Sequence, residues 1–114
     1  MAFQITITTV AEAHLWALPA REQRTLETAI LTRLRDQPTT PTRAIKRLRP
    51  NLLAAFELRV GELRVLYNVE GSEVILLVIG RKVGNKLIVE GKEFYGRQDY
   101  PAEPTGNGPA GDAD

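Results

Sequence analysis

Residues 56–69 restrict the possible folds of this chain more than any other segment, because they have the pattern of a β-hairpin. Apolar residues alternate with polar ones on both sides of the dipeptide Gly61-Glu62, as in strands with one buried face. A Gly-X pair fits a two-residue type II′ turn. With this turn, Arg59 and Arg64 lie directly opposite each other, on the face away from the apolar residues.

Two arginines that face each other across a strand pair indicate a negatively charged partner. Like charges in this position destabilise a sheet. At about 5 Å and an effective dielectric of about 20, the repulsion is about 3 kcal/mol before salt screening. The partner is either a carboxylate of the protein or a phosphate outside it. Glu57 is expected on the same face, either as an internal counter-ion of the two arginines or as a general base beside a phosphate.

A second turn at Gly71-Ser72 extends the register to the next strand. A two-residue loop there pairs Tyr67 with Leu76, and the alternation of side chains then predicts Arg81 on the same face as the other two arginines. The apolar residues expected deeper on this face are Leu66, Ile75, Leu77 and Ile79. A surface that is part apolar and part cationic is not expected to remain exposed to solvent. The C-terminal segment, a second chain or RNA is expected to cover it.

The other periodic segments predict an α/β fold of the α+β kind. Residues 3–7 alternate as a short strand, residues 9–12 have the form of a capping box that starts a helix, and a second helix is expected from about residue 20 to 36. A short helical turn is predicted for residues 43–49, and strands for 74–79 and 87–89. The expected architecture is an N-terminal strand and a two-helix hairpin packed on an antiparallel sheet of about four strands.

Length and charge predict one small domain followed by an acidic tail. Residues 1–96 carry fourteen Lys and Arg against ten Asp and Glu, whereas the Gly/Pro-rich residues 97–114 carry one Arg against four acids. We expect a folded domain over 1–96 and disorder over 97–114. The basic body is compatible with a nucleic acid or an acidic protein as partner. The sequence has no cysteine, no apolar run that would span a membrane and no signal peptide, which predicts a cytoplasmic protein.

At these residues the sequence resembles the RelE/ParE superfamily, the toxins of bacterial type II toxin–antitoxin systems. The matching pieces are residues 3–7, residues 13–18, the hairpin over 56–67 with its Leu-Arg and Arg-Val-Leu-Tyr, and Ile79-Gly80-Arg81-Lys82. The resemblance covers about residues 3 to 93. It implies two N-terminal helices packed on an antiparallel sheet, and a cognate antitoxin protein as partner.

RelE-like members cleave messenger RNA in the ribosomal A site, without a metal or another cofactor. The ribose 2′-OH attacks the adjacent phosphate, and cationic side chains stabilise the charge that develops there. By resemblance, Arg59, Arg64 and Arg81 are the catalytic candidates. Candidate RNA contacts are Lys46, Arg47, Lys82 and Lys86. The implied activity is a ribosome-dependent endoribonuclease that inhibits translation, with the ribosome and mRNA as partners.

Departures from the RelE pattern leave two other functions open. RelE has lysines near the start of the first hairpin strand, where this chain has Ala55 and Glu57. RelE also has a tyrosine near the position of Lys86 and Ile88, whereas Tyr95 lies several residues later. ParE-like members inhibit DNA gyrase and lack the nuclease residues, so a gyrase inhibitor is the first alternative. A toxin-fold binding module without toxicity is the second.

Overall fold

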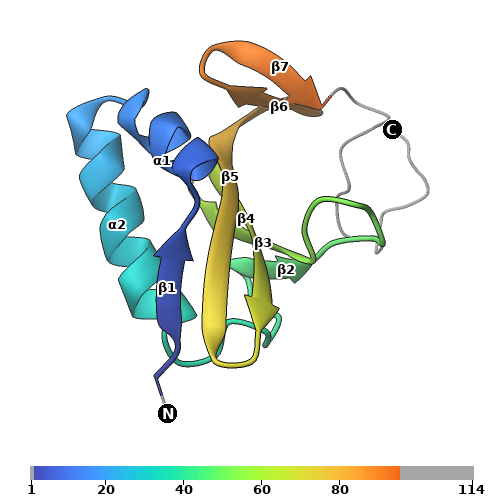
Figure 1. Ribbon diagram of the computed structural model, residues 1–114. Coiled ribbons are helices and arrows are strands. Elements are labelled where there is room, and N and C mark those ends of the chain that lie inside the picture. Colours follow the sequence, from blue (N-terminus) through green and yellow to red (C-terminus); the bar gives the residue numbers. More distant parts are fainter. Residues whose placement is uncertain (1, 96–114) are drawn as a thin grey trace.

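Two helices pack on one face of a seven-stranded sheet in the computed structural model, which describes residues 2–95 (Figure 1). The elements in chain order are β1 (Gln4–Ile7), α1 (Thr9–Trp16), α2 (Ala20–Leu34), β2 (Ile45–Arg47), β3 (Phe56–Val60), β4 (Leu63–Glu70), β5 (Glu73–Val83), β6 (Lys86–Val89) and β7 (Lys92–Tyr95). The predicted acidic tail over 97–114 lies outside the described residues. No helix among those described is long and apolar enough to cross a membrane.

The helical hairpin forms as the sequence predicts. Thr8 caps α1 by accepting a hydrogen bond from the backbone nitrogen of Ala11 at 3.1 Å, so the cap lies one residue before the predicted Thr9. Pro19 precedes the first residue of α2, a position where its missing N–H costs nothing. The apolar stripe of α2 faces the sheet, and its buried members are Leu26, Ile30 and Leu34.

The sheet is larger than the predicted four strands. Its order is β2-β3-β4-β5-β6-β7 with antiparallel neighbours, and β1 pairs parallel with β5. The helical turn predicted for residues 43–49 is wrong, because β2 occupies its centre. The Thr42 hydroxyl accepts hydrogen bonds from the backbone nitrogens of Ala44 and Ile45, which ends the loop. Ile45 then pairs with Leu58 of β3 and is buried.

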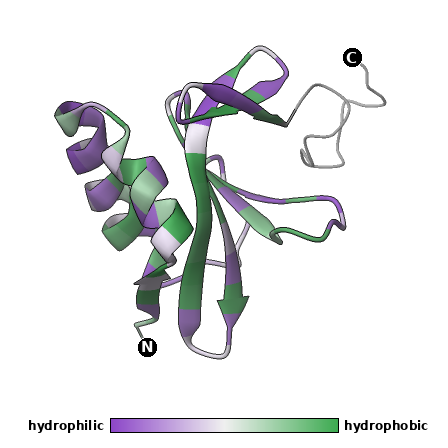
Figure 2. Cartoon of the chain, turned by 45° about the horizontal axis from the view of Figure 1, so that its top comes forward, coloured by the Kyte–Doolittle hydropathy of each residue, from purple (hydrophilic) through white to green (hydrophobic). Residues whose placement is uncertain are grey.

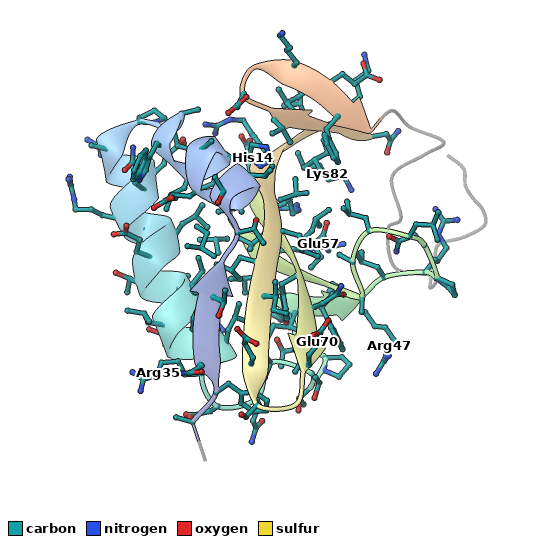
Figure 3. All side chains as sticks on the ribbon, viewed as in Figure 1. His14, Arg35, Arg47, Glu57, Glu70 and Lys82 are labelled. Atoms are coloured by element: carbon teal, nitrogen blue, oxygen red, sulfur yellow. The ribbon has the colours of Figure 1, made fainter. Side chains whose placement is uncertain are left out.

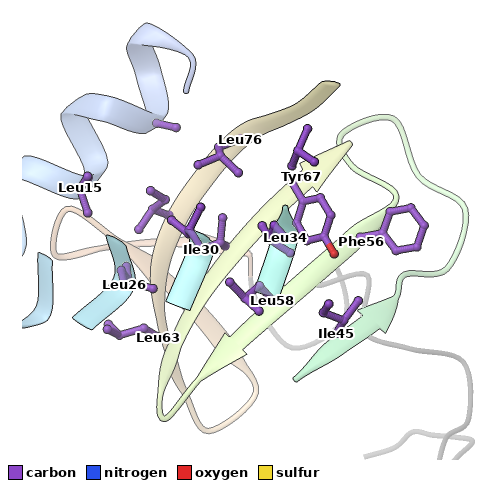
Figure 4. Close-up of a cluster of buried hydrophobic side chains, with 14 residues drawn as sticks. Leu15, Leu26, Ile30, Leu34, Ile45, Phe56, Leu58, Leu63, Tyr67 and Leu76 are labelled. Atoms are coloured by element: carbon purple, nitrogen blue, oxygen red, sulfur yellow. The ribbon is translucent and has the colours of Figure 1, made fainter. Parts of the chain in front are cut away.

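Hydrophobic side chains are buried on both faces of the sheet, in agreement with the nearly unbroken hydrophobic stretch of β5 in Figure 2. The larger core lies between the helices and the sheet, where Leu26 and Ile30 pack with Leu58, Leu63 and Tyr67 (Figure 4). The smaller core lies on the opposite face and contains Leu48, Ala54, Leu66, Val78, Leu87 and Val89. The β2–β3 loop and β6 therefore cover the apolar part of that face.

Tyr67 of β4 connects the larger core to Phe56 of β3 and to the loop after α2. Its ring stacks on Phe56 with 5.5 Å between centroids, and its hydroxyl donates a hydrogen bond to the carbonyl of Pro38 at 2.5 Å. Burial raises the pKa of this hydroxyl well above its ordinary value, so it remains a donor. The bond connects β4 to the loop after α2 and holds that loop against the sheet.

Candidate functional site

The β3–β4 hairpin has the register that the sequence predicts. Arg59 pairs with Arg64, and Val60 pairs with Leu63 across a two-residue turn. Gly61 has φ +59°, the backbone conformation that the first turn position of a type II′ hairpin requires. The two arginines therefore extend from adjacent strands on the face opposite the helices.

Glu57 is the carboxylate that accompanies the two arginines. Its side chain is 1% exposed, and its Oε1 accepts a hydrogen bond from the Arg59 Nε at 2.8 Å. Its Oε2 lies 3.9 Å from the Arg64 Nε. Neither of these last two atoms has a hydrogen-bond partner among the described residues. The internal salt bridge predicted from the hairpin register is thus present.

Arg64 is held in place by the turn as well as by Glu57. Its Nη1 donates to the carbonyls of Gly61 at 2.8 Å and Leu63 at 2.9 Å. Burial lowers the pKa of the Arg64 guanidinium and nearby Arg59 lowers it further, whereas Glu57 and Glu62 raise it. The Arg64 side chain is only 12% exposed, and its Nε has the Glu57 carboxylate at 3.9 Å but no hydrogen-bond acceptor among the described residues.

Arg81 does not join this pair, so the predicted three-arginine cluster is wrong. The β4–β5 pairing contains a register shift between Leu66 and Tyr67. Beyond the shift, Leu63 pairs with Arg81, and both residues face the helices. Arg81 forms a two-pronged ion pair with Glu22 of α2, with Nη1–Oε2 and Nη2–Oε1 distances of 3.0 and 2.5 Å. Ile79 moves to the helix face for the same reason.

The ion pair with Glu22 changes the acid–base properties of both partners. The hydrogen bonds from Arg81 lower the pKa of the Glu22 carboxyl, and the same bonds raise the pKa of the Arg81 guanidinium. The pair connects the last part of β5 to the first turn of α2, where a carboxylate also interacts favourably with the helix dipole. Arg81 therefore connects the sheet to the helix layer through its ion pair with Glu22.

The same register shift brings Lys82 to the face of Glu57. Lys82 pairs with Leu87, a member of the smaller core, and its backbone nitrogen donates to the carbonyl of Glu62 at 2.8 Å. In Figure 3, Lys82 and Glu57 both lie on the side of β5 away from the helices. The sequence analysis named Lys82 as a candidate RNA contact, but unbroken alternation along β5 did not place it on this face.

The other predicted RNA contacts divide between the two faces. Lys46 pairs with Glu57 across β2 and β3, so it shares the face of Glu57. Arg47 faces the other way and lies over the Phe56 ring, 5.1 Å from its centroid. Lys86 forms an ion pair with Glu93 at 3.6 Å between β6 and β7. We use the term Glu57 cluster for the residues that share one face: Lys46, Glu57, Arg59, Arg64 and Lys82.

The comparisons with known proteins point to one group of toxins. No protein-family model and no curated protein matches the chain. Among solved structures, the chain is similar to a chain of the toxin–antitoxin complex RelBE2 of Mycobacterium tuberculosis, with 26% sequence identity and a TM-score of 0.63. The match covers 72% of this chain and 93% of that chain. This likeness supports a RelE-like toxin fold for the chain.

Within this RelE-like fold, the residues from 2 to 95 contain no group of three or more His, Asp or Glu side chains that could hold a metal ion. Tyr95, the tyrosine that lies several residues later than the one in RelE, ends β7 and pairs with Leu87. Ala55 precedes β3, where its backbone nitrogen donates to the Asn68 side chain at 2.7 Å. Among the predicted site residues, the cationic side chains that share a face with Glu57 are Lys46, Arg59, Arg64 and Lys82.

The buried side chain of His14 accepts a hydrogen bond from the backbone of β5. It is 8% exposed, and its Nδ1 accepts from the backbone nitrogen of Ile79 at 3.3 Å. Ile79 lies between the parts of β5 that pair with β1 and β6, so its N–H has no strand partner on that side. Burial lowers the pKa of His14, and Glu90 opposes this effect.

Protonation of His14 is expected to destabilise the protein below about pH 6.5, its ordinary pKa. The unfolded chain takes up this proton at a higher pH than the folded protein does, so the free energy of unfolding falls as the pH drops from 6.5 toward the lowered folded pKa. The stabilisation is complete above pH 6.5. Urea unfolding from pH 5 to 8 measures the slope. His14→Asn, which offers a non-titrating acceptor, should flatten it, and an equal slope in both proteins would contradict this role.

Proposed function

We propose that this chain is the toxin of a type II toxin–antitoxin pair and cleaves messenger RNA on the ribosome. The observation that carries the proposal is the pairing of Arg59 and Arg64 around buried Glu57, in a RelE-like fold. Taken as ionised, these three groups have a net charge of +1, and Lys46 and Lys82 on the same face raise it to +3. Such a surface attracts the phosphates of RNA and positions a strand without reading its sequence.

The chemistry that this site supports is attack of a ribose 2′-oxygen on the adjacent phosphorus, with departure of the 5′-oxygen of the next nucleotide. Negative charge increases on the phosphate oxygens in the transition state. Fixed guanidinium groups stabilise that charge without having to reorganise. Arg64 is bound to two turn carbonyls, and Arg59 is bound to Glu57. Both are therefore oriented before RNA arrives.

A cognate antitoxin is the second part of the proposal. The similar solved chain comes from a toxin–antitoxin complex, RelBE2. An antitoxin that neutralises this chain would cover the Glu57 cluster with an acidic or apolar segment, in one of the usual modes of adding a strand or laying a helix in a groove. Growth inhibition by the toxin alone, relieved by co-expression of the neighbouring gene, is the expected result.

Inhibition of DNA gyrase in the manner of ParE is a second candidate, and the position of Arg81 favours it. Arg81 is bound to Glu22 on the helix face. The cluster also has a buried carboxylate, Glu57, in the region where RelE has lysines. A nuclease site would consequently have fewer cationic groups than the family pattern implies, which is compatible with a toxin that acts by binding.

Induced expression in a bacterial host separates the functions. For the nuclease, we expect growth arrest together with new RNA 5′ ends inside translated reading frames within minutes. A gyrase inhibitor instead gives relaxed plasmid DNA and no new 5′ ends, and a binding module gives normal growth. Growth arrest without new 5′ ends would reject the nuclease proposal.

A further inference from the structure

We infer that Glu57 is a positioning residue, which orients Arg59 and Arg64 as a preformed site for one phosphate group. The inference rests on the proposed function, because it assigns the arginine pair to a phosphate. It adds a role for a carboxylate that would otherwise weaken the binding of any anion. The alternatives are that Glu57 is a general base, or that it only neutralises charge.

The burial of Glu57 argues against a general base. A base must approach the 2′-OH within hydrogen-bond distance, directly or through one water. The Glu57 side chain is 1% exposed, and its Oε2 is buried among protein atoms. The 2′-OH of a bound RNA therefore has no path to this carboxylate while the sheet stays intact. Glu57 must act through the groups that surround it.

The atoms that approach Glu57 show how it acts. In both arginines, the Nε atom faces the same carboxylate, at 2.8 Å in Arg59 and 3.9 Å in Arg64. The guanidinium is planar, so fixing Nε also fixes the directions in which the terminal nitrogens point. The two side chains are 27% and 12% exposed. Their inner atoms thus face Glu57, and part of each side chain remains accessible to a ligand.

The residues that pair with Arg64 across the sheet do not hold its Nε. Gly80 lies opposite Arg64 on β5 and has no side chain to pack against the guanidinium. On the other side, Arg64 faces Arg59, which repels it. Without an acceptor at position 57, the Arg59 guanidinium would lose the hydrogen bond at its Nε and would move away from Arg64, which the turn carbonyls hold in place. A site for one phosphate, which requires both cations within reach of the same group, would then be lost.

Two variants of Glu57 separate orientation from charge. Glu57→Gln and Glu57→Met remove the same negative charge and have similar length, but only glutamine keeps an oxygen that accepts from the Arg59 Nε. The probe is inorganic phosphate, titrated while the ¹⁵N signals of the arginine Nε–H groups are followed. We expect phosphate affinity within about threefold of wild type for Glu57→Gln and at least about tenfold weaker for Glu57→Met, as for loss of one hydrogen bond to a charged group.

Glu22→Gln is the matched control, because it removes one arginine-paired carboxylate from the opposite face and leaves the Glu57 cluster intact. It should not change phosphate affinity. If Glu57 only neutralises charge, both Glu57 variants should bind phosphate more tightly than wild type, and this result would overturn the inference. Absence of phosphate binding by the wild-type protein would overturn it as well.

The wild-type protein tests the inference even if Glu57→Met fails to fold. An Arg59 Nε–H held by a buried carboxylate should exchange with solvent much more slowly than that of Arg21, an exposed arginine in α2. Equal exchange rates would contradict the positioning role. Mapping of RNA ends tests the nuclease proposal separately. A phosphate site that depends on Glu57, without RNA cleavage, would reject the nuclease and leave the inference standing.

Discussion

Arg64→Ala is expected to lower the rate of ribosome-dependent RNA cleavage about a hundredfold, the usual effect of removing one fixed donor from a developing negative charge. Arg64 has little freedom to move, because its Nη1 is bound to the carbonyls of Gly61 and Leu63. Flexible lysines on the same face cannot replace a guanidinium held in this way. Growth inhibition by the variant should be lost for the same reason.

Arg81→Gln is the control that distinguishes the proposed site from the one predicted by sequence. Arg81 lies on the helix face with Glu22, so its replacement should leave the cleavage rate within about threefold of wild type, as for a substitution outside the site. Cleavage is measured by primer extension on purified ribosomes carrying a defined mRNA. Circular dichroism and the melting temperature establish that each variant is folded. If Arg81→Gln loses as much activity as Arg64→Ala, the assignment to the Glu57 cluster is wrong.

The β3–β4 hairpin shows what alternation along a strand can predict. A single two-residue turn connects its strands, so the pairing of Arg59 with Arg64 follows directly from the position of Gly61. The presence of Glu57 between them follows as well, because residues 57 and 59 of one strand share a face. The predicted salt bridge needed no information about the rest of the fold.

The β4–β5 hairpin shows where the same reasoning fails. Its pairing follows the prediction from Glu70 to Tyr67, and then the register shift exchanges the faces of all later residues in β5. A one-residue shift has this effect because the side-chain period of a strand is two. Nothing in the local sequence marks the shift with a glycine or proline. Arg81 and Lys82 therefore exchange roles, and only the structure reveals it.

Long-range contacts account for the other differences from the sequence. The segment that forms β2 has no strand pattern in the sequence, because it consists largely of basic residues and is followed by Pro50. It forms a strand because Ile45 is buried against Leu58 of β3. The burial of His14 has no local sequence signal, since its hydrogen-bond partner Ile79 lies 65 positions away. Tertiary contacts of this kind override local propensity, and a single sequence does not contain them in readable form.

Gly80→Ala is expected to destabilise the protein by about 3 kcal/mol, at the upper end of the range for overpacking. A Cβ at this position would lie 2.5 Å from the carbonyl oxygen of Ile88 and 2.9 Å from the Val89 Cγ2. The first of these is a backbone atom, so β6 itself must move. Because Leu87 and Val89 of β6 cover the smaller core, the displacement also exposes apolar surface there.

Denaturant unfolding measures the loss, and amide hydrogen exchange shows where it occurs. Faster exchange should be confined to the β5–β6 pairing and β7, with α2 and the β3–β4 hairpin unchanged at low denaturant. Gly84→Asn is the matched control. It lies in the turn between the same two strands with open space around it, and asparagine tolerates the positive φ of +61° at this position. An equal loss of stability in both variants would contradict the close approach of β6 as the reason for glycine at position 80.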